Sequence, residues 1–201
     1  MTDWNEIAQR ARSAVESVSA PETSAFLADW PTRRVTRAIV PATLPVLRWL
    51  AETADQAPPG RLAALAHTVN EARAALRWRQ TYQPGEIATY FLERYGWCEI
   101  IGLSGPIVCN ALACGVLLLG PHTLYPSHHH VAEELYIPLS GSAEWQRGLG
   151  PFVVRGAGEI VVHGSLEPHA MRTNAAPLLA LYLWRGAGLA ESARLWSSPR
   201  P

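Results

Sequence analysis

The sequence predicts an α+β chain, mainly β, in which an N-terminal helical region precedes a C-terminal β-barrel. Residues 1–95 are rich in Ala, Arg, Glu and Leu and carry apolar residues at helical spacing. After Gly96 the chain changes to short apolar runs separated by Gly or Pro, which is typical of an antiparallel sandwich or barrel. We therefore expect a helical region at 1–95 that packs on a barrel at 96–196, followed by a tail at 197–201.

Proline, glycine and capping residues divide the first half into five predicted helices. Asp3 caps the first helix, which extends to about Val18. The fourth helix follows a Pro-Pro-Gly break and carries Leu62, Leu65 and Val69 on one face, the spacing of an amphipathic helix. The other predicted helices begin at Pro21, near Pro45 and at Pro84, and the last of them extends to about Tyr95.

The second half contains six apolar runs that we interpret as strands of the barrel. They are residues 98–101, 115–119, 134–139, 152–155, 159–162 and 178–184. Each run is too short for a typical helix, and turn residues separate successive runs.

The charge composition excludes several function classes. Of the 201 residues, 17 are Lys or Arg and 17 are Asp or Glu, so the formal net charge is zero. A general nucleic-acid binder or a polybasic membrane binder is therefore not expected. The basic residues are all Arg, which excludes a lysine Schiff base, pyridoxal phosphate attachment and a phosphate-binding lysine. We interpret Arg73, Arg77 and Arg79 as a solvated helix face.

The cysteines and the hydropathy pattern bear on the cellular compartment. Cys98, Cys109 and Cys114 form no CxxC motif and lie in apolar surroundings, so we expect buried thiols. The longest apolar stretch, 111–120, is about half of the roughly 20 residues that a membrane span needs. Because the N-terminus also lacks the pattern of a signal peptide, we expect a cytoplasmic protein without a membrane span.

A cluster of histidines carries the strongest chemical signal. Side chains alternate faces along a strand, so His128 and His130 share one face, as do Glu134 and Tyr136. His169, on a later strand, can add a fourth ligand. Three neutral imidazoles and one carboxylate suit one divalent first-row transition ion, whether Fe, Mn, Co, Ni or Zn.

The residues around this cluster have more than one interpretation. Strand alternation directs His129 and Glu133 away from the ligands, and His129 is either a surface residue or a group that orients a ligand. His163 ends a predicted strand and is either a surface residue or a supporting group at the pocket. Pro126 interrupts the alternation, so strand parity does not place Tyr125.

Two segments resemble the motifs of the cupin superfamily. The first is His128-x-His130-(x)3-Glu134-(x)6-Gly141, and the second is Gly158-(x)5-Gly164 followed by His169 and Asn174. The second motif departs from the family pattern, because Gly164 stands in place of a Pro. The resemblance implies a double-stranded β-helix, or jelly-roll, barrel with a metal in its interior.

A narrower resemblance involves the block Tyr125-Pro-Ser-His-His-His-Val-Ala-Glu-Glu-Leu-Tyr136, which is similar to the signature of the cupin dimethylsulfoniopropionate (DMSP) lyases. The chain length and the helical N-terminal region also resemble members of that family with a helical extension. The resemblance implies that the metal ligands are His128, His130, Glu134 and His169. It also implies that Tyr136 is the catalytic base and that Tyr125 is a second catalytic tyrosine at the pocket.

The chemistry of such a lyase agrees with these residue types. DMSP carries a carboxylate and a sulfonium, and its β-elimination to dimethyl sulfide and acrylate begins with loss of a proton next to the carboxylate. A bound metal ion acidifies that proton, and a nearby cation favours the phenolate form of Tyr136, which can then act as the base. The alternative is that Tyr136 is an aromatic residue of the barrel with a purely structural role. Aromatic faces attract the sulfonium, and Tyr182 and Trp184 are candidates for this wall of the substrate pocket, with His129 and His163 as further pocket candidates.

The same residues are compatible with two other functions. A cupin metal site also serves isomerases, epimerases and oxygenases that act on a small carboxylate or a sugar, and the fold does not choose among them. A non-catalytic cupin that binds a small molecule is the third hypothesis. In each case we expect a small-molecule partner, no nucleic acid, no membrane and possible homodimers.

Overall fold

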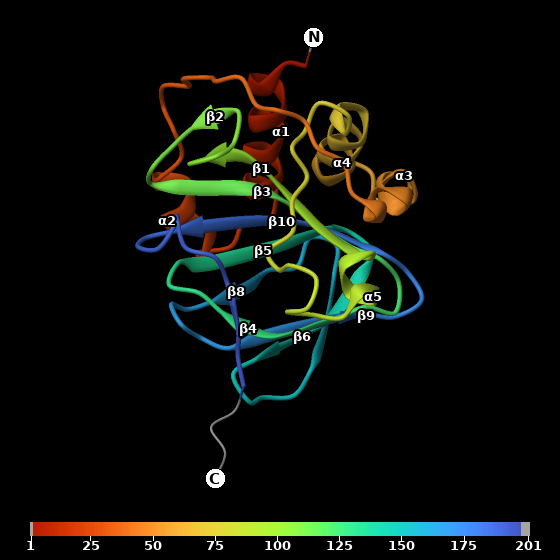
Figure 1. Cartoon of the computed structure of the whole chain (residues 1–201). Helices are drawn as coiled ribbons and strands as arrows, with labels where there is room; N and C mark the ends of the chain where they lie inside the picture. Colours follow the sequence, from red (N-terminus) through yellow and green to blue (C-terminus); the bar gives the residue numbers. More distant parts are fainter. Residues whose placement is uncertain (1, 198–201) are drawn as a thin grey trace.

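Helices occupy the first half of the chain in the computed structural model, which describes residues 2–197 (Figure 1). They are α1 (Trp4–Ser17), α2 (Thr23–Ala28), the 3-10 helix η1 (Pro45–Trp49), α3 (Leu50–Asp55), α4 (Arg61–Ala72) and α5 (Thr89–Leu92). Asp3 caps α1 as predicted, because its carboxylate accepts hydrogen bonds from the backbone N–H groups of Asn5 and Glu6. Residues 198–201, which are most of the predicted tail, lie outside the described residues, as does residue 1.

The predicted fifth helix is wrong over most of its length. Only the four residues of α5 are helical, because Gly85 adopts a φ of +98° and Pro84 pairs with Ile87 in an isolated bridge. Tyr95, at the predicted end of the helix, is instead the first residue of a strand and pairs with Leu119. Pairing with a distant strand therefore overrides the helical pattern here.

In the described part of the chain, the strands form two sheets. The larger contains, in spatial order, β2 (Ile107–Val108), β1 (Tyr95–Gly102), β3 (Leu112–Leu119), β10 (Leu178–Arg185), β5 (Glu133–Ser140) and β8 (Val161–His163). The smaller contains β11 (Arg194–Leu195), β4 (Leu124–His129), β9 (His169–Thr173), β6 (Ser142–Arg147) and β7 (Val153–Gly156). All six predicted apolar runs overlap strands of these sheets, so the predicted mainly-β second half is confirmed.

Both faces of the larger sheet are buried, but they contact different partners. Along β10, Leu179 and Leu181 belong to a hydrophobic cluster shared with the helices, whereas Ala180 and Tyr182 belong to a second cluster shared with the smaller sheet. Figure 1 shows α1, α3 and α4 on the outer side of the larger sheet and the strands β4, β6 and β9 on its other side. The helical region therefore covers the barrel from outside, and the site lies between the sheets.

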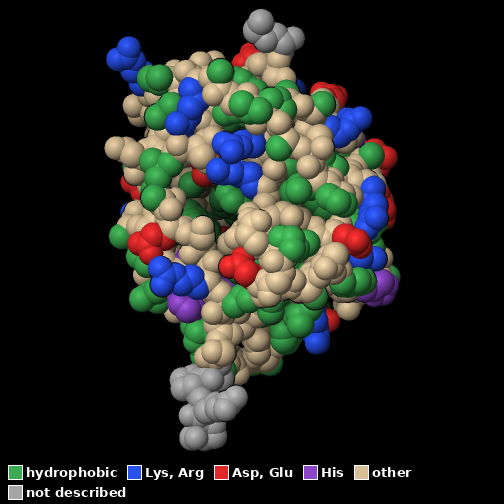
Figure 2. Space-filling view, in the orientation of Figure 1, with side chains coloured by type: hydrophobic (Ala, Val, Ile, Leu, Met, Phe, Trp, Pro, Cys, Tyr) green, Lys and Arg blue, Asp and Glu red, His purple; other side chains and the backbone are tan. Residues whose placement is uncertain are grey.

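The distribution of surface charges and the burial of the cysteines agree with what the sequence composition predicts. Basic and acidic side chains are interspersed over the face shown in Figure 2. The three cysteines in the described residues are buried and free, as predicted. Among residues 2–197, no helix is long and apolar enough to cross a membrane.

Candidate metal centre and pocket

Three predicted ligands meet between the two sheets. The ligand atoms of His130, Glu134 and His169 all lie within 4.8 Å of one another, and all three side chains are buried. Nε2 of His130 lies 3.0 Å from Oε2 of Glu134, and Nε2 of His169 lies 3.2 Å from the same oxygen. Segments that are distant in sequence supply these groups, because Glu134 is on β5 and His169 is on β9.

Backbone carbonyl groups determine which ring nitrogen each histidine directs at the site. Nδ1 of His130 lies 2.9 Å from the carbonyl oxygen of Ala132, and Nδ1 of His169 lies 2.8 Å from that of Glu167. A carbonyl oxygen only accepts, so Nδ1 carries the proton in both rings. In the neutral rings, the lone pairs of both Nε2 atoms therefore face the carboxylate of Glu134.

This arrangement fits a bound cation. Two imidazole lone pairs and a carboxylate oxygen repel one another unless a positive charge lies between them. His169 Nε2 is buried and makes no hydrogen bond with any described residue. Two imidazole nitrogens and a carboxylate oxygen are also donors that divalent first-row transition ions accept. The residues present therefore fit the metal that the sequence predicts.

The charges at the centre act on one another strongly. Burial opposes ionisation of Glu134, but the nearby His130, supported by His169, outweighs burial and holds the pKa of this carboxyl well below its usual range. Burial likewise lowers the pKa of His130, but the charge of Glu134 outweighs burial and raises it above 6.5. Glu134 is therefore an anion at neutral pH, and His130 is the neighbour that favours this charge most.

His128, the fourth predicted ligand, lies beside this group but outside the compact set of three. Its ring is 4.2 Å from that of His169 and 6.3 Å from that of His130, measured between centroids. Its Nδ1 lies 2.9 Å from the carbonyl oxygen of Pro126, so its Nε2 also holds a lone pair in the neutral ring. Burial and then the neighbouring His169 lower the pKa of His128 well below 6.5, so the ring stays neutral.

A register shift in β4 decides the position of Tyr125. The pairing with β9 is irregular between Tyr125 and His128, and the two rings stack at 3.9 Å with an interplanar angle of 8°. Tyr125 therefore shares a face with His128 although the two are three residues apart. Its hydroxyl lies 3.4 Å from the hydroxyls of both Tyr82 and Tyr95.

Two aromatic side chains support the ligands directly. The indole N–H of Trp184 donates a hydrogen bond to Oε1 of Glu134 at 2.5 Å, and its ring stacks on His130 at 4.2 Å. The ring of His163 stacks on His169 at 3.9 Å and 9°. Of the two interpretations of His163, the surface one is wrong, because its side chain is fully buried and burial lowers its pKa to about 2.

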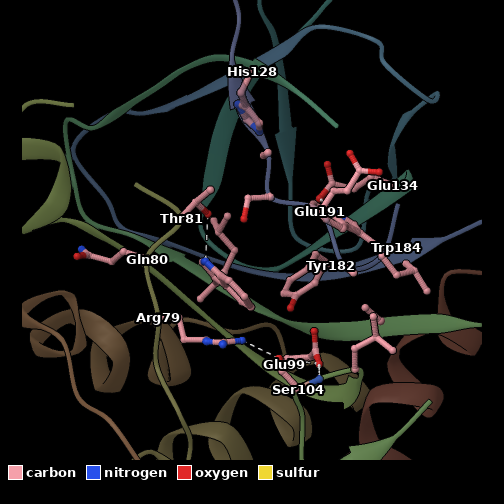
Figure 3. Close-up of a pocket in the computed structure, with 18 of the residues that line it drawn as sticks. Arg79, Gln80, Thr81, Glu99, Ser104, His128, Glu134, Tyr182, Trp184 and Glu191 are labelled. Carbon is pink, nitrogen blue, oxygen red and sulfur yellow. Dashed lines mark hydrogen bonds between the residues drawn. The ribbon is translucent and has the colours of Figure 1, made fainter. Parts of the chain in front are cut away.

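A cavity of about 410 Å³ opens beside the centre, as Figure 3 shows. Of the predicted site residues, six line it: Tyr125, His128, Glu134, Tyr136, Tyr182 and Trp184. His130 and His169 are not part of the cavity wall, but both contact Glu134, and Glu134 does line the cavity. His129 and His163 lie outside the wall, so the structure does not bring these two predicted pocket residues to the cavity.

The sequence did not point to two parts of the cavity wall, one from residues 189–193 and one from the segment before β3. Tyr95, Trp97 and Glu99 line the cavity from alternate positions of β1. These three residues occupy every second position, and the apolar Cys98 between them is buried on the opposite face. This alternation in the sequence is the signal that could have placed the three on one face of a strand. Arg79 also lines the cavity, in a bridge with Trp97, so its prediction as part of a solvated helix face is wrong.

Comparison with known sequences gives a consistent result. A family model described as dimethylsulfoniopropionate lyase matches residues 19–180. "Dimethylsulfoniopropionate lyase DddQ" of Ruegeria pomeroyi is 39% identical over 124 residues, which are 62% of this chain and 62% of that protein. "Putative dimethylsulfoniopropionate lyase DddL" of Cereibacter sphaeroides is 28% identical over 164 residues, which are 80% of this chain and 68% of that protein. The match with the Ruegeria relative thus spans less than two thirds of its length.

Solved structures extend the similarity to both halves of the chain. One described as "Crystal structures of DMSP lyases RdDddP and RnDddQII" has a TM-score of 0.85 at 31% identity and covers 97% of this chain and 100% of that one. The crystal structure of DMSP lyase DddQ from Ruegeria pomeroyi has a TM-score of 0.82 at 30% identity and covers 94% and 96%. Because the superposition includes the helices as well as the strands, the predicted fold class is confirmed.

Proposed function

Because the chain belongs to the cupin-fold dimethylsulfoniopropionate lyase family, we propose that it cleaves DMSP to dimethyl sulfide and acrylate in the cavity beside Glu134. The observation that carries the proposal is the convergence of His130 and His169 on one oxygen of Glu134, beside a cavity lined by tyrosines. That convergence suits a cation that holds a substrate carboxylate.

We assign the metal to His130, Glu134 and His169, with His128 as the fourth ligand. The ion is one divalent transition metal, and the ligand types accept Fe, Mn, Co, Ni or Zn. When bound, it withdraws electron density from the substrate carboxylate and so makes the neighbouring C–H more acidic. Trp184 and the carbonyl groups that accept from each Nδ1 keep the ligands oriented.

Tyr136 is the proposed base. It lies two residues after Glu134 on β5, on the same face, and its side chain is buried in the cavity wall. Burial and then the negative charge of Glu134 raise the pKa of Tyr136 well above 10, so the phenol keeps its proton unless positive charge is added nearby. The base function of Tyr136 therefore depends on a cation at the ligands.

The phenolate oxygen of Tyr136 takes the proton from the carbon next to the carboxylate, and the electron pair of that C–H bond becomes the second bond of the carbon–carbon double bond. The bond from the next carbon to sulfur breaks, and its electrons leave with sulfur as neutral dimethyl sulfide. Tyr125, the second catalytic candidate, contacts Tyr82 and Tyr95 through its hydroxyl, which holds it at the cavity wall.

Headspace gas chromatography for dimethyl sulfide tests the proposal. Purified protein is loaded with Fe, Mn, Co, Ni or Zn in turn and given DMSP. We expect release with at least one metal and its loss in His130→Ala. His67→Ala is the matched control, because it removes an exposed histidine of α4 and keeps full activity. Stoichiometric metal binding without release under any metal would contradict the proposed lyase.

A further inference from the structure

A second carboxylate, that of Glu99, lines the cavity and is held in one orientation. Its Oε1 accepts hydrogen bonds from the backbone N–H of Ser104 at 2.6 Å, the hydroxyl of Ser104 at 3.0 Å and the backbone N–H of Gly105 at 2.7 Å. All hydrogen bonds that the described residues make to this carboxylate go to Oε1. The other oxygen, Oε2, has no donor among residues 2–197.

The backbone around Glu99 is shaped to hold this carboxylate. The pairing of β1 with β3 is irregular between Glu99 and Ile101, and such bulges redirect side chains beside binding sites. Gly102 follows with a φ of +147°, and a Cβ atom there would lie 2.6 Å from the carboxylate carbon of Glu99. The turn therefore requires glycine at this position to leave room for the carboxylate.

Glu99 has no direct counter-charge in the described residues. Arg79 is the one guanidinium group in the described cavity wall, and it donates to the hydroxyl of Ser104 at 2.6 Å while lying over the ring of Trp97. No ion pair within 4.0 Å joins Arg79 to Glu99 in residues 2–197. The charge of Glu99 is thus compensated only through an intervening hydroxyl.

One row of paired residues connects Glu99 to the proposed base. Glu99 pairs with Gly115, Gly115 with Tyr182, and Tyr182 with Tyr136, so all four share the cavity face of the larger sheet. Three strand spacings separate the ends of this row by about 14 Å between Cα atoms. Figure 3 shows Glu134 and His128 on one side of Tyr182 and Glu99 with Ser104 on the other.

We propose that Glu99 binds the cationic end of a small zwitterionic carboxylate whose other end lies at Glu134 and its histidines. Aromatic rings complete the cation site, since Trp97 and Tyr182 lie edge to face at 6.2 Å in the same wall. The identity of the cation as the sulfonium of DMSP rests on the proposed function. Glu99 is thus a specificity-determining residue, which selects a carboxylate with a cationic far end over one of the same shape with an uncharged far end.

The test compares two ligands that differ only in charge. One is 3-(trimethylammonio)propionate, which has a cationic end, and the other is its isostere 4,4-dimethylpentanoate, which has an uncharged tert-butyl group there. Both are titrated calorimetrically into the metal-loaded protein. We expect the wild type to bind the cationic ligand about tenfold more tightly. In Glu99→Gln this ratio falls at least about threefold, to the part that the aromatic rings alone provide. The affinity for 4,4-dimethylpentanoate changes less than about twofold, since Gln keeps an acceptor oxygen for the turn.

Three variants make the result specific. Glu93→Gln removes an equal charge outside the cavity, so it retains the ratio. Glu191→Gln removes the exposed carboxylate of the same wall, and collapse of the ratio in that variant instead of Glu99→Gln overturns the assignment. If Glu99→Gln does not fold, Glu99→Asp retracts the charge, and an unchanged ratio there overturns the proposal.

The failures of the two proposals are distinguishable. Dimethyl sulfide release without a cation preference overturns the role of Glu99 and leaves the lyase. A cation preference lost in Glu99→Gln, without release from DMSP, overturns the lyase and leaves Glu99 as the cation site. No binding of either ligand, together with no dimethyl sulfide release, overturns both.

Discussion

In each histidine of the site, a contact with a backbone carbonyl oxygen determines which ring nitrogen is free to bind a metal. In His128, His130 and His169 the Nδ1 atom lies 2.8 to 2.9 Å from a carbonyl oxygen two residues away. Because the proton is therefore on Nδ1, each neutral ring presents Nε2 as a ligand. A single tautomer in all three rings lowers the conformational cost of metal binding.

The side-chain oxygen of Tyr136 is the group that accepts the substrate proton in the proposed reaction. Tyr136→Phe removes it but keeps the ring that packs on Trp145 at 5.0 Å. We expect dimethyl sulfide release to fall by about 10²- to 10⁴-fold, the usual contribution of a general base, with metal content unchanged. Headspace chromatography and metal analysis of the same sample measure both. Full activity in this variant would exclude Tyr136 as the base.

Metal affinity is expected to depend on pH through His130. Burial lowers its pKa, but Glu134 outweighs burial and raises it above 6.5, and metal binding requires the neutral ring. The affinity therefore falls as the pH drops through this raised pKa, by up to about tenfold per pH unit for one displaced proton. Metal titrations between pH 5.5 and 8.5 measure the slope, and equal affinities across that range would contradict the charge assignment.

Among the strands, β1, β3 and β10 leave room for a side chain of the site through a glycine on the central strand β3. Gly115 pairs with Glu99 on one side and Tyr182 on the other. A Cβ atom at this position would contact the carbonyl oxygen of Cys98 and lie 2.8 Å from the hydroxyl of Tyr182. The absence of a side chain on β3 therefore lets Tyr182 occupy the space between the two carboxylate ends of the cavity.

Gly115→Ala is expected to destabilise the fold by about 1–3 kcal/mol, because the added methyl group overpacks the sheet. It also displaces Tyr182, so the KM for DMSP should rise. Urea unfolding and the kinetics of dimethyl sulfide release measure the two effects. Gly156→Ala is the matched control: a Cβ atom there lies 3.8 Å from the nearest side-chain atom, and the expected change is within about 0.5 kcal/mol. Equal stability of both variants would contradict this packing argument.

At the scale of the whole molecule, the helical region and the barrel share one hydrophobic cluster. Val15 of α1 and Leu65 of α4 belong to the same buried cluster as Leu181 of β10. The guanidinium of Arg185 adds a polar connection, since it contacts Asp29 at 2.8 Å and Glu133 at 2.7 Å. Neither half buries its apolar face without the other, so the two are expected to unfold together.

Removal of the metal tests this coupling. With the free metal at about 100 times its Kd, binding stabilises the native state by about 2.7 kcal/mol, so a chelator should lower Tm by roughly 5–10 °C. The transition should remain single by both circular dichroism and tryptophan fluorescence, because the ligands come from strands that also support the helices. Two separate transitions would show that the halves fold independently.

The sequence by itself determined the features that depend on local pattern. Alternation along one strand placed Glu134 and Tyr136 on one face. The His-x-His spacing predicted two ligands, of which His130 belongs to the compact group with Glu134 and His169, whereas His128 lies beside that group. The change of texture near Gly96 predicted helices before strands. These signals involve neighbouring residues, whose geometry the backbone dictates within a few positions.

Only the tertiary structure decided which distant segments meet. The row from Glu99 to Tyr136 depends on the register of four strands, and the cavity wall at Arg79 depends on its bridge with Trp97. The same long-range pairing drew Tyr95 into a strand where the local pattern predicted a helix. The physical reason is that register and burial are properties of the assembled sheets, whereas periodicity describes one segment at a time.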